Sequence, residues 1–214
     1  MDLLVVLDCD GVMFDSREAN RAFYGHLRGN FGRPPLTEAD VTFVHAHPAP
    51  ESVPFIFSEW PQDIAAVNVY RAALDYTPFL RQMSIAPDLL EFLAAVRPPL
   101  LTAISTNRTS TMAAVLDAFV LRPHFDMVVT ALDVDRPKPH PEALHKILAD
   151  FGLRAEEGVF VGDTQVDVDH AAAVGMPLIA FRSPNLQAAY HVSSFRDVLQ
   201  LPPFAAAGSF SAAC

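Results

Sequence analysis

Near its N-terminus the chain carries an aliphatic run that ends abruptly in acidic residues. Residues 3–7 are all aliphatic, and Asp8, Cys9, Asp10 and Gly11 follow them directly. An aliphatic run without alternation is typical of a strand that is covered on both faces, as in a parallel α/β sheet. Ligands of such sheets bind at the carboxyl ends of the strands. We therefore expect a central parallel strand that presents two carboxylates at a binding edge.

The same residues also fit an ordinary turn, because Asp and Gly are common turn residues. On a strand, however, Asp8 and Asp10 point to the same side, where an apolar sheet solvates them poorly. Two such charges cost free energy unless a cation neutralises them. The rest of the chain decides between the two interpretations.

From residue 100 onward, short apolar runs alternate with helical patterns. We expect strands at residues 100–105, 127–130, 159–161 and 178–181, and helices at residues 110–120, 141–151 and 166–174. Strands and helices in this order form a parallel sheet with right-handed crossovers. The predicted fold class is therefore α/β, a Rossmann-like parallel sheet flanked by helices.

Residues 15–84 interrupt this pattern with an inserted helical module. We expect helices at about residues 16–31 and 61–74, and a proline-rich loop at residues 47–50. The core domain would then comprise residues 1–14 and 85–201, and residues 202–214 would be a tail that is poorly ordered from residue 204 onward.

Composition narrows the class of protein. A net charge of −10 and the lack of a dense basic run argue against a nucleic-acid partner. The two cysteines, Cys9 and Cys214, form no disulfide framework, and no apolar run approaches a membrane span, so we expect a cytoplasmic protein with no membrane partner. Only two lysines, Lys138 and Lys146, accompany thirteen arginines, which makes a lysine beside the acidic cluster notable.

Polar groups follow each of the predicted strands. They are Asp8 and Asp10, then Ser105, Thr106 and Asn107, then Lys138, and finally Asp163 and Thr164 with Asp167 one helical turn later. All of them would meet at one edge of the sheet. Three or four carboxylates in one cleft favour a hard divalent cation such as Mg²⁺, which can share its coordination with a substrate phosphate.

These segments resemble the four motifs of the haloacid dehalogenase-like superfamily of phosphohydrolases. The first motif is residues 8–12, the second Thr106-Asn107, the third Lys138-Pro139 and the fourth residues 162–164 with Asp167. All four occur in the family's order and at roughly its spacing. The resemblance implies a core that extends to about residue 200, and it identifies the insertion at residues 15–84 as a small α-helical cap domain.

The resemblance also implies residue roles. Asp8 would attack phosphorus and form an aspartyl-phosphate, and Asp10 would act as general acid and then general base. Thr106 and Lys138 would hold the phosphoryl oxygens, with Asn107 beside them at the substrate. The Mg²⁺ ligands would be Asp8, Asp163 and the backbone carbonyl of Asp10, with Asp167 in the outer shell or bound through water.

We therefore expect a Mg²⁺-dependent phosphatase that hydrolyses the phosphomonoester of a small metabolite. A phosphomutase similar to β-phosphoglucomutase and a non-catalytic phosphate-binding module remain as alternatives, whereas Asp10 argues against a dehalogenase. The substrate and the oligomeric state stay open. In this family the cap would select the substrate, but the polar and aromatic residues of the insertion match no known cap motif. These residues are Arg17, Arg21, Arg28, His45, His47, Trp60 and Arg71.

Other residues near the motifs have structural interpretations. We expect Arg108, just after Asn107, to be a surface charge at a helix start. The pairs His45/His47 and His140/His145 lack further ligands at metal-site spacing and are expected to be non-ligating histidines. Cys9 would point away from the two aspartates into the core.

Overall fold

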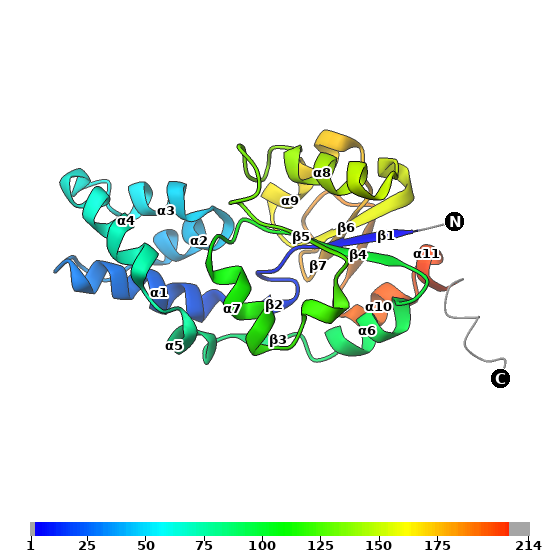
Figure 1. Ribbon diagram of the computed structural model, residues 1–214, viewed down its shortest axis with the longest axis horizontal. Helices are drawn as coiled ribbons and strands as arrows, with labels where there is room; N and C mark the ends of the chain where they lie inside the picture. Colours follow the sequence, from blue (N-terminus) through cyan, green and yellow to red (C-terminus); the bar gives the residue numbers. More distant parts are fainter. Residues whose placement is uncertain (1–2, 206–214) are drawn as a thin grey trace.

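A parallel sheet forms the centre of the molecule. The computed structural model describes residues 3–205 (Figure 1). The six strands of this sheet run in the order β5-β4-β1-β6-β7-β8, with every neighbouring pair parallel. The strands are β1 (Leu4–Leu7), β4 (Leu101–Ser105), β5 (Met127–Val129), β6 (Gly158–Gly162), β7 (Leu178–Phe181) and β8 (Tyr190–Val192). The predicted α/β class is confirmed. Strand β8 was not predicted, because it is short and Val192 is its only buried residue.

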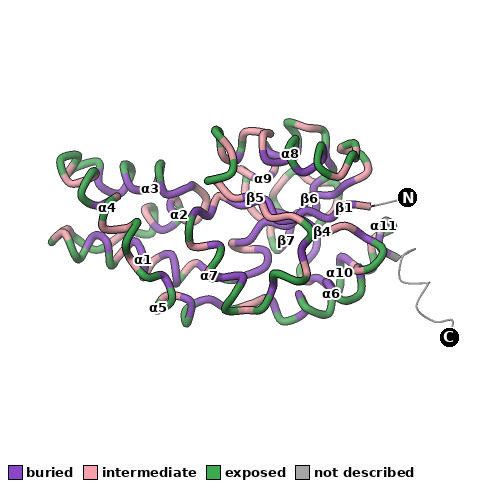
Figure 2. The backbone as a smooth tube through the Cα atoms, viewed as in Figure 1, coloured by how far each residue is buried: buried purple, intermediate pink, exposed green. Residues whose placement is uncertain are grey.

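Strand β1 lies in the middle of the sheet, as its unbroken aliphatic run predicts. All four of its residues are fully buried (Figure 2), and Leu7 pairs with Ile104 of β4 and Val161 of β6. The backbone N–H of Asp8 then donates to the carbonyl of Val161 over 2.9 Å. The carboxyl ends of these three strands are therefore level, which brings the residues that follow them to one edge.

Alternation along β1 divides the core into two apolar layers. Val5 and Leu7 pack with one group of helices, namely α6 (Leu89–Val96), α7 (Thr111–Ala118) and α10 (Phe195–Leu199). Leu4 and Val6 face the other side, which is covered by α8 (Glu142–Phe151) and α9 (Gln165–Val174). Helices thus flank both faces (Figure 1). Short 3-10 turns at Arg122–His124 and Ala155–Glu157 precede β5 and β6.

The helical insertion, residues 15–84, lies beyond the carboxyl end of β1 (Figure 1). Its two connections pair as a small antiparallel ribbon of β2 (Phe14–Asp15) and β3 (Ser84–Ile85). Between them come α1 (Arg17–Asn30), α2 (Glu38–Ala46), α3 (Ala49–Ile56), a 3-10 turn (Pro61–Asp63), α4 (Ile64–Ala73) and α5 (Thr77–Leu80). One apolar cluster joins Phe23 and Val53 of the insertion to Val5 and Leu93 beneath the sheet. The division into core and cap domains therefore stays a prediction.

Two predictions about local structure are correct only in part. The expected loop at residues 47–50 is confined to His47 and Pro48, and α3 begins at Ala49, because Pro50 occupies the first helical turn, where its missing N–H is not needed. The expected tail at residues 202–214 begins with the short helix α11 (Pro202–Ala205). Phe204 in this helix is 2% exposed and lies with its ring centroid 6.0 Å from that of Phe92. The remainder of the predicted tail lies outside the described residues.

Within residues 3–205, no helix combines the length and the apolar character that a membrane span requires.

Candidate active site

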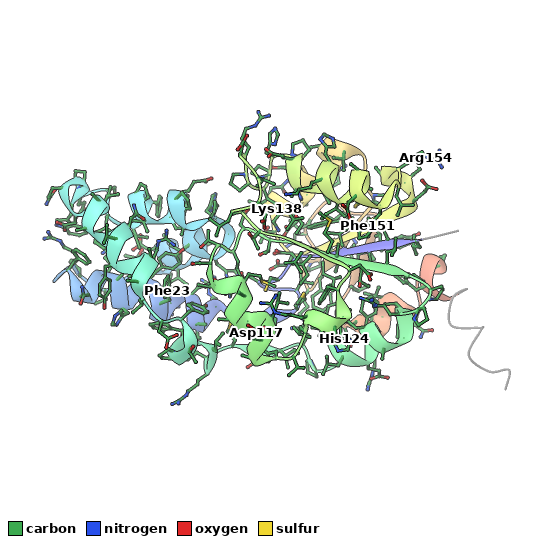
Figure 3. The ribbon with its side chains drawn as sticks, viewed as in Figure 1. Phe23, Asp117, His124, Lys138, Phe151 and Arg154 are labelled. Carbon is green, nitrogen blue, oxygen red and sulfur yellow. The ribbon has the colours of Figure 1, made fainter. Side chains whose placement is uncertain are left out.

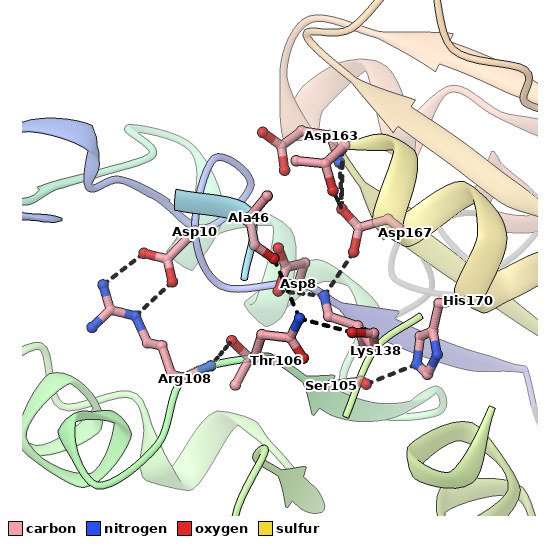
Figure 4. A network of polar contacts seen from close by, with 12 residues as sticks. Asp8, Asp10, Ala46, Ser105, Thr106, Arg108, Lys138, Asp163, Asp167 and His170 are labelled. Carbon is pink, nitrogen blue, oxygen red and sulfur yellow. Dashed lines mark hydrogen bonds and ion pairs between the residues drawn. The ribbon is translucent and has the colours of Figure 1, made fainter. Parts of the chain in front are cut away.

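The ends of four strands and the first turn of one helix bring the predicted site residues to a single edge of the sheet (Figure 4). Asp8 follows β1, Thr106 follows β4, and Lys138 comes from the loop after β5. Asp163 follows β6, and Asp167 lies in the first turn of α9. Figure 3 places Lys138 on the side of the sheet that faces the insertion.

Lys138 bridges two of the carboxylates. Its Nζ atom lies 2.8 Å from Oδ1 of Asp8 and 2.6 Å from Oδ1 of Asp167. All three residues are buried, with exposed fractions of 4%, 7% and 0% for Lys138, Asp8 and Asp167. Burial alone would lower the pKa of Lys138, but the charges of Asp167 and Asp8 raise it well above its usual value. Lys138 is therefore an ammonium group fixed beside Asp8.

Asp167 is held from both sides. Its Oδ2 atom accepts hydrogen bonds from the Thr164 hydroxyl at 2.8 Å and from the backbone N–H groups of Asp163 and Thr164 at 3.2 and 3.1 Å. This is a capping box at the start of α9, which explains why an aspartate three residues after Thr164 turns back toward the strand end. Both oxygens are thus engaged, and Asp167 positions Lys138.

Asp8, Asp163 and Asp167 form a compact carboxylate group in the described part of the chain. One oxygen from each lies within 4.8 Å of the others. Oδ1 of Asp163 is buried and has no hydrogen-bond partner within residues 3–205. Burial, together with the charges of Asp167 and Asp8, raises the pKa of Asp163 to about 9. A divalent cation with oxygen ligands would relieve this repulsion, so the residues present fit a Mg²⁺ site.

Gly11 makes room for this carboxylate group. Its φ angle is +82°, and a Cβ atom there would lie 2.0 Å from Oδ2 of Asp163. A side chain at position 11 would therefore displace Asp163 in addition to straining the backbone. The glycine after the two aspartates is a requirement of the site and not only of the turn.

Asp10 turns toward Arg108 and its carboxylate does not join the other three. Nε of Arg108 lies 2.8 Å from Oδ2 of Asp10, Nη2 lies 2.6 Å from Oδ1, and the Ser16 hydroxyl also donates to Oδ1. Burial acts to raise the pKa of Asp10, but the charge and hydrogen bonds of Arg108 outweigh it and lower the pKa below its usual value. Strand β1 ends at Leu7, so strand alternation no longer governs where Asp10 points.

The prediction that Arg108 is a surface charge is wrong. The residue is 7% exposed, because the end of the insertion folds over it. Its Nη1 atom donates to the Tyr76 hydroxyl at 3.3 Å, and Nη2 lies 3.7 Å from Sδ of Met83. The available sequence signal was its position directly after Thr106 and Asn107, but its burial depends on residues of another segment.

Thr106 and Asn107 have different environments. Thr106 is buried, and its Oγ1 atom accepts a hydrogen bond from the backbone N–H of Arg108 at 3.2 Å, which leaves the hydroxyl proton free to donate. Nδ2 of Asn107 donates to the carbonyls of Ala46 at 3.3 Å and Lys138 at 3.1 Å. Asn107 therefore ties the end of α2 in the insertion to the Lys138 loop. Its buried Oδ1 atom has no partner among the described residues.

His170 is a site residue that the sequence did not reveal. Its Nδ1 atom lies 2.9 Å from the carbonyl of His140, and its Nε2 atom lies 3.1 Å from the Ser105 hydroxyl. A carbonyl only accepts, so Nδ1 carries the proton and Nε2 accepts from Ser105. Burial and the nearby Lys138 ammonium lower the pKa of His170 to about 3. The ring is a neutral support beneath Lys138, and nothing in its spacing in the sequence distinguishes it.

A pocket opens between the insertion and Asp10. Its polar walls are formed by Asn20, Tyr24, His45, His47, Arg71 and Tyr76 from the insertion, and by Asp10, Asn107 and Arg108 from the sheet side. His45 lies in helix α2, where its Nδ1 atom is 3.0 Å from Nδ2 of Asn20. His45 and His47 are thus pocket residues, and neither belongs to the acidic group described above. Cys9 is fully buried, as predicted.

Comparison with known proteins identifies the family and the fold of the chain. A family model described as haloacid dehalogenase-like hydrolase matches residues 5–181. The crystal structure of a HAD-superfamily hydrolase, subfamily IA, variant 1, from Geobacter sulfurreducens PCA is 35% identical, with a TM-score of 0.82 over 94% of this chain and 99% of that chain. A predicted phosphoglycolate phosphatase from Haemophilus somnus 129pt shares the fold at 18% identity, with a TM-score of 0.79 over 93% of this chain and 97% of that one.

A similar relation holds for curated sequences. The phosphoglycolate phosphatase of Salmonella typhi is 27% identical over 158 residues, which are 72% of this chain and 54% of that protein. The chain thus spans about half the length of the curated relatives it matches first. The resemblance seen in the four motifs is confirmed by the family model and by the Geobacter structure.

Proposed function

Because this chain belongs to the haloacid dehalogenase-like hydrolase family, we propose that it is a Mg²⁺-dependent phosphatase that hydrolyses a small phosphomonoester through an aspartyl-phosphate. The observation that carries the proposal is the placement of Asp8, a buried carboxylate 2.8 Å from the Lys138 ammonium and grouped with Asp163 and Asp167. A buried nucleophile beside a fixed cation suits attack on an anionic phosphoryl group.

In the first step, a carboxylate oxygen of Asp8 forms a bond to phosphorus while the bond from phosphorus to the ester oxygen breaks. Lys138 and the free hydroxyl proton of Thr106 bind oxygens of the transferring group. Lys138 is held for this task by Asp167, whose own position is set by the start of α9. The charge stabilisation is therefore in place before substrate arrives.

Asp10 serves both steps as the acid and base. It protonates the departing ester oxygen, and it then takes a proton from the water that hydrolyses the aspartyl-phosphate. Arg108 keeps Asp10 ionised in the structure, which is the form that the second step requires. Donation of a proton in the first step requires Asp10 to leave Arg108 and to carry a proton, which it takes from solvent or keeps from the water of the preceding turnover.

Mg²⁺ would be held by the carboxylates of Asp8 and Asp163 and by the backbone carbonyl of Asp10, with Asp167 in the outer shell. When bound, it supplies positive charge that neutralises the acidic group and the phosphoryl oxygens. The orphaned Oδ1 atom of Asp163 supports this assignment.

We assign substrate choice to residues 15–84 as a cap over a core of residues 1–14 and 85–201. The ribbon of β2 and β3 supplies two adjacent connections that can serve as a hinge. The pocket supports this role, since its walls come from both parts of the chain. Phosphoglycolate is the first substrate to test, because relatives carry that name.

The proposal is tested by measuring phosphate release with Mg²⁺ from a panel of small phosphate esters that includes phosphoglycolate. Wild-type protein should release phosphate, and Asp8→Asn should not, because an amide is a poor nucleophile. Turnover by Asp8→Asn at the wild-type rate would overturn the covalent mechanism. Binding without any release would favour the non-catalytic module, and transfer of the phosphoryl group to a sugar would favour the phosphomutase.

A further inference from the structure

One half-buried arginine of the insertion, Arg71, has no anionic partner among the described residues. Most of the thirteen arginines pair with a carboxylate, but within residues 3–205 four form no ion pair: Arg71, Arg81, Arg136 and Arg182. The last three are exposed to solvent, whereas Arg71 is half-buried. Its Nε atom is buried and has no hydrogen-bond partner in the described structure. A buried donor without an acceptor is uncommon and calls for a ligand.

Arg71 lines a pocket in which such a ligand could bind. Arg71 lies in the last turn of α4 and lines the pocket that also contains Asp10 and Arg108. In the structure without substrate, Arg108 is neutralised by its two contacts with Asp10, so Arg71 is the arginine of this pocket that has no carboxylate partner among the described residues before substrate binds. The surrounding Asn20, Tyr24 and Tyr76 side chains add polar groups but no carboxylate.

We propose that Arg71 binds a carboxylate on the leaving group of the substrate, so that the enzyme acts on phosphomonoesters of small hydroxy acids. This inference rests on the proposed phosphatase function. A guanidinium group binds two coplanar carboxylate oxygens with paired hydrogen bonds. One unpaired cation matches the single charge of a carboxylate better than a second phosphate, which carries about −1.5 to −2.

The arrangement also orients the substrate. The phosphoryl group lies at Asp8 and Lys138, and the ester oxygen must be near Asp10 to receive a proton. A carboxylate carried by the leaving group then extends past Asp10 into the pocket, where it can contact Arg71. Asp10 is thus bracketed by the two charged ends of the substrate.

The test compares phosphoglycolate with ethyl phosphate, which has no carboxylate, in the presence of Mg²⁺. Arg71→Gln should lower kcat/KM for phosphoglycolate by about 10- to 100-fold, the typical effect of a lost charged hydrogen bond, and leave that for ethyl phosphate unchanged. Arg71→Lys should retain part of the preference. Arg81→Gln is the matched control, because Arg81 is an exposed, unpaired arginine of the same insertion. This variant should prefer phosphoglycolate over ethyl phosphate as strongly as the wild type does.

Binding to the Asp8→Asn variant, measured by calorimetry, separates this inference from turnover. If phosphoglycolate binds more tightly than ethyl phosphate and Arg71→Gln removes the difference, the assignment of Arg71 stands even if no ester is hydrolysed. If Arg71→Gln changes both esters equally or neither, the assignment is overturned while the phosphatase proposal stands. Tighter binding of propane-1,3-diol bisphosphate than of phosphoglycolate would also overturn it.

Discussion

Arg108 donates two hydrogen bonds to the carboxylate of Asp10, from Nε to Oδ2 over 2.8 Å and from Nη2 to Oδ1 over 2.6 Å, although the two residues are 98 positions apart in the sequence. Both side chains are largely buried, with 5% and 13% exposed. Arg108 also contacts Tyr76 and Met83, which lie where the chain returns from the insertion. The ion pair therefore connects the proposed acid and base to the segment that carries the proposed cap.

Removing one partner of this pair should destabilise the fold. Arg108→Met leaves the Asp10 carboxylate buried without its cation, and we expect the free energy of unfolding to fall by about 3–5 kcal/mol. Urea denaturation at neutral pH measures this loss. The double variant Asp10→Asn/Arg108→Met should recover part of the stability, because no buried charge is left unpaired.

An exposed ion pair supplies the control. Arg122 and Asp117 are also bonded through the guanidinium, but their side chains are 55% and 63% exposed. Arg122→Met should lower the free energy of unfolding far less than Arg108→Met does, because water and salt screen an exposed ion pair. If Arg108→Met and Arg122→Met lowered the free energy of unfolding equally, burial would not be the reason that the Asp10–Arg108 pair stabilises the fold.

The acidic group should make stability depend on a divalent cation. Mg²⁺ at about 100 times its dissociation constant should add about 2.7 kcal/mol to the free energy of unfolding, because the folded state alone groups Asp8 and Asp163. Thermal unfolding with Mg²⁺ and with excess EDTA measures the shift. Asp163→Asn should lose most of it, and an undiminished shift in that variant would place the cation elsewhere. Phosphate release should also stop in EDTA.

Two glycines with similar backbone angles should differ in their tolerance of a methyl group. Gly11→Ala places Cβ 2.0 Å from Oδ2 of Asp163. At Gly32, whose φ angle is +64°, an added Cβ would have no atom of the described part of the chain within 4 Å. Gly11→Ala should abolish cation-dependent stabilisation, while Gly32→Ala should cost only about 1 kcal/mol of backbone strain. If the two variants bind the cation equally well, Gly11 is not required for the position of Asp163.

The sequence predicted those site residues that directly follow a strand along the chain. Asp8, Thr106 and Asp163 follow strands whose apolar runs are visible in the sequence, and parallel pairing then brings the strand ends together. Their catalytic roles stay predictions. Arg108 could not be placed, because its burial depends on Tyr76 and Met83, which fold over it from the insertion.

Helix α3 and the helical turn at Phe204 were also not predicted, because they too depend on contacts with residues distant in sequence. Helix α3 contains Pro50 and Pro54, which indicate a loop when the sequence is considered alone. Tertiary packing overrides that preference, because Val53 and Ile56 of α3 are buried in the same apolar cluster as Val5 and Leu7. Phe204 likewise gains its helical turn from contact with Phe92, which is distant in sequence.

His170 should make stability depend on pH. The unfolded residue has a pKa near 6.5, whereas burial and the Lys138 ammonium lower the folded pKa to about 3. Between these two values the unfolded state binds more protons than the folded state, so stability falls as the pH falls, by at most about 1.4 kcal/mol per pH unit. From about one pH unit above 6.5, His170 is largely neutral in both states, and its contribution no longer changes with pH.

The variant His170→Gln isolates this contribution, because glutamine can still donate to the carbonyl of His140 but cannot take up a proton. Urea denaturation at pH 7.5, 6.5, 5.5 and 4.5 should show the wild-type protein losing stability more steeply than the variant below pH 6.5, with parallel behaviour above it. The carboxylates titrate in both proteins, so their effect cancels in the difference. Parallel curves over the whole range would mean that His170 takes up a proton in the folded state, which is incompatible with a neutral ring that accepts from Ser105 and lies near the Lys138 ammonium.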